Sequence, residues 1–323
     1  MAFFLFKKFR QILITFFGIT LLTFGIIHLA PGDPTDLQTT MNPRVSAQAK
    51  EKLKRLYGLD RPLSVQYVDW LRRFLTLDLG HSFVDGESVS KKILGRLPIT
   101  ITINILSLLL IMILAFPIGV LSAAKQYSWF DKGTTLFVYI GFAMPHFWLA
   151  LLLMLLFGVY WGWLPLSGFQ SLSVGQMSFG ERLIDWGRHL ILPVLTASFS
   201  GLAGYSRYLR SEMLEVVRQD YIRTARAKGL TEKTVIFKHA LRNALLPVIT
   251  IMGLELPALI GGSVIIETIF AIPGMGQLSF QSVLARDYPV IMGVTMFGAV
   301  LTLIGNFLAD LGYAWINPRV RLT

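Results

Sequence analysis

Residues 99–124 read ITITINILSLLLIMILAFPIGVLSAA and contain no charged side chain. An apolar run of about 20 residues is long enough to cross about 30 Å of hydrocarbon as an α-helix. Six runs in the chain share this property, and each predicts a membrane-spanning helix: 11–30, 99–124, 136–158, 190–206, 244–266 and 290–309. The sequence therefore predicts an all-α integral membrane protein with six transmembrane helices.

The composition agrees with a membrane location. Of the 323 residues, 54% are hydrophobic and 15% are charged, whereas about 25% are charged in soluble proteins. The net charge is +11, but the basic residues flank apolar runs, where they set topology rather than bind nucleic acid. We therefore expect the lipid bilayer as a partner and no nucleic acid.

The distribution of charge predicts the orientation. Residues 207–242 contain nine basic and four acidic side chains, and the positive-inside rule places such a segment in the cytoplasm. Six spans then put both termini in the cytoplasm. Lys91, Lys92 and Arg96 oppose this arrangement, but long loops escape the rule. We expect three parts: a cytoplasmic end and first helix at 1–31, an extracytoplasmic insert at 32–97, and a five-helix core at 98–323 with a cytoplasmic coupling segment at 207–242.

The predicted insert is charged and amphipathic. Residues 50–55 form one helical-looking stretch, and Tyr67, Trp70 and Phe74 recur at helical spacing in another. Trp70 and Phe74 are expected to pack the insert together, with direct contact to an external partner as the alternative. We expect the insert and residues 274–288 to lie on the outer face of the membrane.

The sequence lacks the motifs of catalytic membrane proteins. No histidine is followed by Glu, which excludes a His-Glu-x-x-His zinc site, and no Gly-x-Ser-x-Gly elbow occurs. No Gly-Lys dipeptide occurs, which excludes a Walker-type phosphate loop. The chain has no Cys and hence no disulfide or thiolate metal site. We expect no catalytic residues, no bound metal or cofactor, and no ATPase site of its own.

Helix-breaking residues crowd the fifth apolar run together with a carboxylate. A charged residue at mid-span costs about 2.5–3.5 kcal/mol unless it faces water or a partner, and helix breaks are tolerated where water or neighbours satisfy the backbone. We therefore predict that a pathway is lined by Glu255, Pro257, Gly261 and Gly262. A structural hydrogen bond from Glu255 to a neighbouring helix is the alternative.

Residues 218–230 read RQDYIRTARAKGL. This pattern predicts a short amphipathic helix that Gly229 ends. Composition alone is also compatible with a solvated basic loop that only sets topology.

The segment closely resembles the EAA loop of the inner-membrane permease subunits of bacterial ABC importers, specifically the dipeptide, oligopeptide and nickel group. The family's opening Glu-Ala-Ala reads Arg223-Thr224-Ala225 here, and Leu246-Pro247 follows Gly229 later than in sugar permeases. Both departures resemble the peptide group's own variant. Similar motifs extend over essentially the whole chain: Pro31-Gly32-Asp33-Pro34, Gly58-Leu59-Asp60, Asp78-Leu79-Gly80 with Ser82, Pro145-His146-Phe147-Trp148, Glu267-Thr268-Ile269-Phe270, Pro273-Gly274, Arg286-Asp287-Tyr288-Pro289 and Asn317-Pro318-Arg319.

This resemblance implies a type I ABC importer permease fold and the first of two permease subunits in the bacterial cytoplasmic (inner) membrane. It implies three kinds of partner: a second homologous permease, two ATPase subunits that bind ATP and magnesium, and an extracytoplasmic solute-binding protein. The coupling helix would contact the ATPase through Asp220, Tyr221, Arg223, Ala225, Arg226, Ala227 and Gly229. Di- or oligopeptides are the expected cargo. The alternatives are nickel, glutathione or another small solute and, in a different class, a self-contained secondary transporter.

Overall fold

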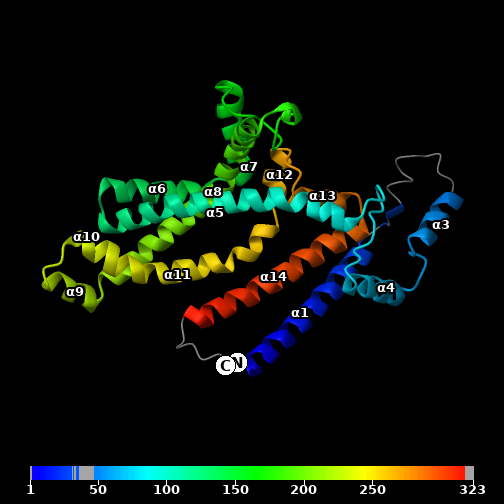
Figure 1. Cartoon of the computed structure of the whole chain (residues 1–323), viewed down its shortest axis with the longest axis horizontal. Coiled ribbons are helices and arrows are strands. Elements are labelled where there is room, and N and C mark those ends of the chain that lie inside the picture. Colours follow the sequence, from blue (N-terminus) through cyan, green and yellow to red (C-terminus); the bar gives the residue numbers. More distant parts are fainter. Residues whose placement is uncertain (1, 31, 33, 36–46, 317–323) are drawn as a thin grey trace. The chain divides into compact units, whose positions relative to one another are not determined.

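The computed structural model describes residues 2–30, 32, 34–35 and 47–316, and within these ranges it is built from helices (Figure 1). Its longer helices are α1 (Ala2–Leu29), α3 (Ala47–Leu56), α4 (Leu63–Leu75), α5 (Val89–Ala124), α6 (Trp129–Ala143), α7 (His146–Leu153), α8 (Phe179–Val217), α9 (Asp220–Ala227), α11 (Leu241–Leu254), α13 (Met275–Leu284) and α14 (Tyr288–Ile316). Shorter helical segments are η1 (Met154–Tyr160), η2 (Val174–Gln176), α10 (Glu232–Thr234), η3 (Val235–Ala240), η4 (Leu256–Ile260) and α12 (Val264–Ile269).

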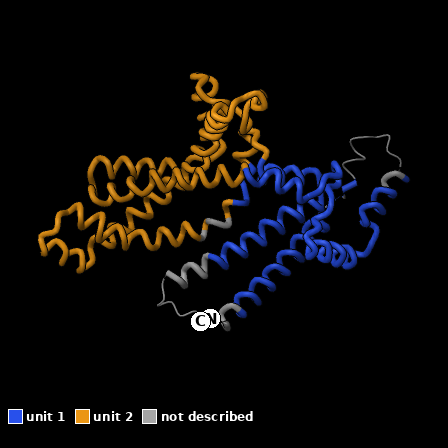
Figure 2. Tube along the Cα trace, viewed as in Figure 1, with its two compact units in different colours: residues 1–98, 260–264, 274–323 blue, residues 99–259, 265–273 orange. Residues whose placement is uncertain are grey.

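The chain forms two compact units (Figure 2). The first unit comprises Met1–Pro98, Ile260–Val264 and Gly274–Thr323. The second unit comprises Ile99–Leu259 and Ile265–Pro273.

Four helices among the described residues are long and apolar enough to cross a membrane: Phe6–Leu29, Val89–Ala124, Glu232–Gly253 and Tyr288–Leu308. The pair Trp129–Ala143 and His146–Tyr160 makes a fifth span if the two parts are counted together. The predicted run 190–206 lies inside α8, a helix that is not among these spans. That run is short, and charged residues occupy both ends of the 39-residue helix.

Two of the predicted runs are not single helices. The run 136–158 bends by 105° between α6 and α7, where Met144 is extended and Pro145 precedes α7. Proline cannot continue a hydrogen-bonded helix and disfavours a helical conformation in the residue before it. In the run 244–266, α11 ends at Leu254, and Gly262 adopts φ +66° before α12 begins. Both predicted runs are therefore interrupted where helix-breaking residues occur.

The insert packs on α1 within the first unit. The ring centroids of Phe16 and Phe74 lie 5.5 Å apart, and those of Trp70 and Phe74 lie 5.6 Å apart. Tyr67 contacts the ring of Phe24, and its hydroxyl lies 2.8 Å from the hydroxyl of Thr20. Phe74 thus packs α4 on α1, whereas the expected role of Trp70 and Phe74 in packing the insert together stays a prediction.

Long helices organise the second unit around α8, which contacts α6, α7 and α11. Its first turn is stabilised by a capping box, in which the Ser178 hydroxyl accepts from the Glu181 N–H and the Glu181 carboxylate accepts from the Ser178 N–H. One apolar cluster joins the end of α5, the second half of α8, α9 and α11. This cluster holds the predicted coupling segment in place.

Candidate functional site

The predicted coupling segment contains a helix, α9, of eight residues. It starts after Gln219, which has extended backbone angles, and Asp220 occupies its first turn, where a negative charge is favourable. Gly229 has φ +77°. The N–H of Gly229 donates to the Arg226 carbonyl at 2.9 Å, and the N–H of Leu230 donates to the Ala225 carbonyl at 3.4 Å. This pair of bonds is a Schellman motif, so the predicted stop at Gly229 is confirmed.

The two faces of α9 differ in burial. Ile222 and Ala225 are buried in the apolar cluster with Leu209 and Met213 of α8. The exposed side chains of α9 include Tyr221, Arg223, Thr224, Arg226 and Ala227. Ala225 therefore packs against the chain's own core, whereas Ala227 lies on the surface.

Polar contacts fix the ends of this segment to its neighbours. Arg226 donates two hydrogen bonds to the Glu232 carboxylate, at 2.7 and 3.1 Å, and this partner raises the pKa of Arg226. The Asn243 side-chain amide donates to the Tyr221 hydroxyl at 2.8 Å. Since Asn243 belongs to α11, α9 is tied to the helix that runs on to Glu255. The hydrogen bond from Asn243 thus connects α9 with the helix that precedes Glu255.

A partly buried ion pair secures α8 against α6 at the start of the coupling segment. Nε and Nη2 of Arg210 donate to the Asp131 carboxylate at 2.6 and 2.8 Å. The carboxylate also accepts from the Ser122 hydroxyl and from the Tyr127 N–H. Sequence reasoning missed this pair. Ser128 and Asp131 have the spacing of a helix cap, but nothing local identifies a partner 79 residues away.

The pathway candidates lie around the break after α11. Glu255 follows α11 directly and is exposed, and Pro257 lies in the short helix η4. Gly261 and Gly262 belong to the first unit, whereas Glu255 and Pro257 belong to the second. The buried carboxylate of this region is instead Glu267, which accepts from the Thr100 hydroxyl at 3.0 Å. Glu267 lies one residue beyond the predicted run, although it opens one of the motifs quoted above.

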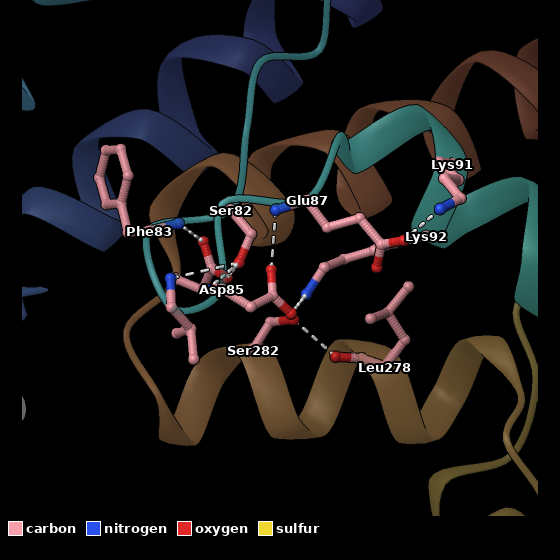
Figure 3. A network of polar contacts seen from close by, with 10 residues as sticks. Ser82, Phe83, Asp85, Glu87, Lys91, Lys92, Leu278 and Ser282 are labelled. Atoms are coloured by element: carbon pink, nitrogen blue, oxygen red, sulfur yellow. Dashed lines mark hydrogen bonds and ion pairs between the residues drawn. The ribbon is translucent and has the colours of Figure 1, made fainter.

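A polar network in the first unit joins two segments that the sequence assigned to the outer face (Figure 3). The Asp287 carboxylate accepts from the Ser82 hydroxyl, and from the Phe83 N–H at 3.0 Å. Lys92 of α5 donates to Asp85 at 2.5 Å and lowers the pKa of that carboxyl. The turn at 82–88 is thereby tied to the residue that precedes α14.

Comparison with known proteins finds two matching family models. The model described as "Binding-protein-dependent transport system inner membrane component" matches residues 115–322. The model described as "Binding-prot-dependent transport system membrane comp, N-term" matches residues 1–104.

Similar curated proteins cover nearly the whole chain. The oligopeptide transport system permease protein AppB of Bacillus subtilis is 46% identical over 304 residues, which is 94% of each chain. The di/tripeptide transport system permease protein DppB of Pseudomonas aeruginosa is 39% identical over 334 aligned positions, covering 98% of each chain. The dipeptide transport system permease protein DppB of Escherichia coli is 37% identical, again over 98% of each chain.

Proposed function

Because the chain belongs to the family of binding-protein-dependent transport system inner membrane components, we propose that it forms half of the translocation pathway for di- or oligopeptides. The chain is a permease subunit of an ATP-driven importer and is not an enzyme, since a separate subunit of such importers hydrolyses ATP. The family recognised in the sequence is thus confirmed. Peptide cargo is supported by the names of the similar permeases.

The chain is a multi-pass protein of the inner membrane and works with ATPase and binding-protein partners. The proposed assembly contains this chain, a second homologous permease, two ATPase subunits that bind ATP and magnesium, and an extracytoplasmic solute-binding protein. In the proposed type I topology, six spans leave both termini in the cytoplasm and the insert outside. The basic segment 207–242 supports this orientation.

The coupling role is supported by one observation: one face of α9 is buried in the protein and the other is exposed. Its inner face, with Ile222 and Ala225, is buried in the same apolar cluster as Val248 and Met252 of α11. Its outer face presents Arg223 and Ala227. A partner that displaces α9 would therefore move α11 with it, because packed interiors transmit displacement. The proposed result is movement of Glu255, which directly follows α11. The residues that we assign to the pathway are Glu255, Pro257, Gly261 and Gly262.

The coupling role is tested by a substitution that changes only the exposed face of α9. Ala227→Trp adds bulk to the exposed outer face, so the chain should fold normally but lose the co-purified ATPase subunits and ATP hydrolysis stimulated by the loaded binding protein. The matched control is Leu172→Trp, which changes a fully exposed side chain in a loop of the second unit and should retain both. Normal ATPase association and stimulation in Ala227→Trp would reject α9 as the contact surface.

Orientation and cargo need separate measurements. Trypsin added outside sealed right-side-out vesicles should cleave at residues 50–55, and cleavage only from the inside would reverse the proposed topology.

The binding protein that co-purifies with the complex should bind di- or oligopeptides in calorimetric titrations. If it binds nickel or glutathione instead, the cargo assignment is wrong while the permease assignment stands.

A further inference from the structure

A polar pocket opens beside the partly buried ion pair of the second unit. Its empty volume is about 560 Å³, including the space at its mouth. Three elements line it: α5, α6 and α8. Its polar lining consists of Ser122, Thr134, Thr135, Tyr139, Ser206, Arg207 and Arg210. Two guanidinium groups and several hydroxyls thus converge on one space.

The charge of this pocket is not neutralised within the described part of the chain. Arg210 is paired with Asp131, but this uses two of the five N–H donors of its guanidinium group. Arg207 is exposed, and no carboxylate among the described residues forms an ion pair with it. The pocket therefore carries one uncompensated positive charge and suits an anion that can accept several N–H bonds.

The serine and threonine hydroxyls restrict the ligand further, because their own hydrogens are already used. The hydroxyls of Thr134 and Thr135 donate to the Asp131 carbonyl at 2.9 and 2.8 Å. Those of Ser122 and Ser206 donate to the Asp131 carboxylate and to the Ala203 carbonyl. These oxygens can still accept hydrogen bonds. A complementary ligand therefore combines a negative charge with hydroxyl donors.

The surroundings of the pocket are those of a membrane interface. Trp129, 88% exposed, and Tyr127, 76% exposed, lie at the start of α6, and such aromatic side chains gather at headgroup level. Lys132 lies over the Trp129 ring, 5.2 Å from its centroid. Further along α6, Leu136 and Tyr139 are exposed and offer an apolar surface for an acyl chain.

The pocket lies on the same side as the coupling segment. From Arg210, α8 continues for seven residues to its end at Val217, a rise of roughly 10 Å, and α9 follows. The orientation proposed above assigns this end of the second unit to the cytoplasmic leaflet. Basic pockets between helices on that side are suited to lipid headgroups.

We propose that this pocket binds the headgroup of an anionic phospholipid that carries hydroxyl groups, of the phosphatidylglycerol type. The phosphate accepts N–H bonds from Arg207 and from the outer edge of Arg210. The headgroup hydroxyls donate to the oxygens of Thr134, Thr135 and Ser206, and an acyl chain lies along α6. The proposal concerns the chain's attachment to the bilayer and does not depend on the transported solute.

The test uses the whole importer complex in nanodiscs that contain phosphatidylcholine with a minor fraction of phosphatidylglycerol. After detergent washing, mass spectrometry should find phosphatidylglycerol retained, and a photoreactive analogue should cross-link to α6 or α8. Arg207→Gln, which leaves the Asp131–Arg210 pair intact, should reduce retention roughly tenfold, the effect of losing one charge-assisted hydrogen bond. Arg207→Lys should recover part of it. The matched control Arg182→Gln removes an exposed arginine elsewhere on α8 and should retain lipid normally.

Several results would overturn the proposal. Unchanged lipid retention in Arg207→Gln, or an equal loss of lipid in Arg182→Gln, would mean that nonspecific electrostatic attraction holds the lipid and that this pocket does not. If phosphatidic acid were retained as well as phosphatidylglycerol, the headgroup hydroxyls would have no part in binding. Equal competition by free glycerol phosphate would indicate a site for a soluble anion. Cross-linking of a photoreactive group at position 139 to the second permease, with no lipid adduct, would show that a protein covers the pocket.

Discussion

The buried carboxylate of Asp287 accepts a hydrogen bond from the hydroxyl of Ser82, 205 positions earlier in the chain. The same carboxylate accepts from the Phe83 N–H at 3.0 Å. This contact closes the turn at 82–88 onto the start of α14, and Tyr57 stacks on Phe83 with its hydroxyl bonded to the Phe83 carbonyl. These polar contacts at the junction between the insert and α14 lie beside an apolar cluster that includes Val89, Ile93 and Val290.

We expect Asp287→Ala to lower the free energy of unfolding by about 2–3 kcal/mol, because it leaves a buried donor and a partly buried donor without their charged acceptor. Thermal unfolding followed by tryptophan fluorescence measures the change. Asp78→Ala is the control, since Asp78 caps the exposed N–H of Gly80, and such surface changes usually stay within about 0.5 kcal/mol. Equal stability of Asp287→Ala and the unmodified chain would contradict a structural role for this contact.

The Asp131–Arg210 pair predicts strong coupling between two distant positions. The Asp131 side chain is 4% exposed and that of Arg210 is 28% exposed. Arg210→Ala leaves a carboxylate buried without its cation, so we expect a loss of about 3 kcal/mol or more. The double variant with Asp131→Ala should lose less than the two single variants combined.

Unfolding measurements on all four proteins of this cycle test the coupling. A coupling energy of about 1.5–3 kcal/mol is the expected result for residues in direct contact. Additive losses would mean that the two side chains contribute independently to stability.

The left-handed conformation of Gly229 predicts a cost that arises in the local backbone and not from contact with packing neighbours. Apart from Gly229 and its two neighbours in the chain, no residue has an atom within 4 Å of the position where a Cβ would be added, so Gly229→Ala should cost only about 1–2 kcal/mol from its φ of +77°. Gly187, inside α8 and equally open, is the control, and Gly187→Ala should stabilise by about 0.5–1 kcal/mol.

Hydrogen exchange over residues 218–243 should report this local loss in Gly229→Ala, together with weaker stimulated ATP hydrolysis. Gly229→Asn should restore much of both, because Asn tolerates the left-handed region better than other residues with a Cβ. Protection unchanged by Gly229→Ala would show that the Schellman motif does not hold the coupling segment.

Substitutions of Glu255 and of Glu267 should have different effects, because Glu255 is exposed and Glu267 is buried. Glu255→Gln should leave unfolding unchanged and slow peptide uptake by up to about fivefold, the equivalent of about 1 kcal/mol for an accessible ion pair. Glu267→Ala should instead lower stability by about 1.5–3 kcal/mol through loss of the bond from Thr100. Uptake of every substrate at the normal rate by Glu255→Gln would remove that residue from the proposed pathway.

The sequence by itself determined the local features of this protein. The run at 99–124 ends at the same residue as α5, and the runs at 11–30 and 290–309 fall almost wholly within α1 and α14. Gly229 ends the segment that begins with α9, as its position suggested. Such features depend on hydrophobic run length and on backbone preferences of single residues, and both can be read without knowledge of distant neighbours.

Only the tertiary structure decided which distant groups meet. It paired Asp131 with Arg210 and Ser82 with Asp287, and it placed Ala225 in the core while Ala227 stayed exposed. It also showed that Pro145 turns one apolar run through a sharp bend, whereas Pro193 and Pro247 lie inside continuous helices. Side-chain partners far apart in the chain, and the response of a helix to a proline, depend on what packs around them, and that is set by the fold as a whole.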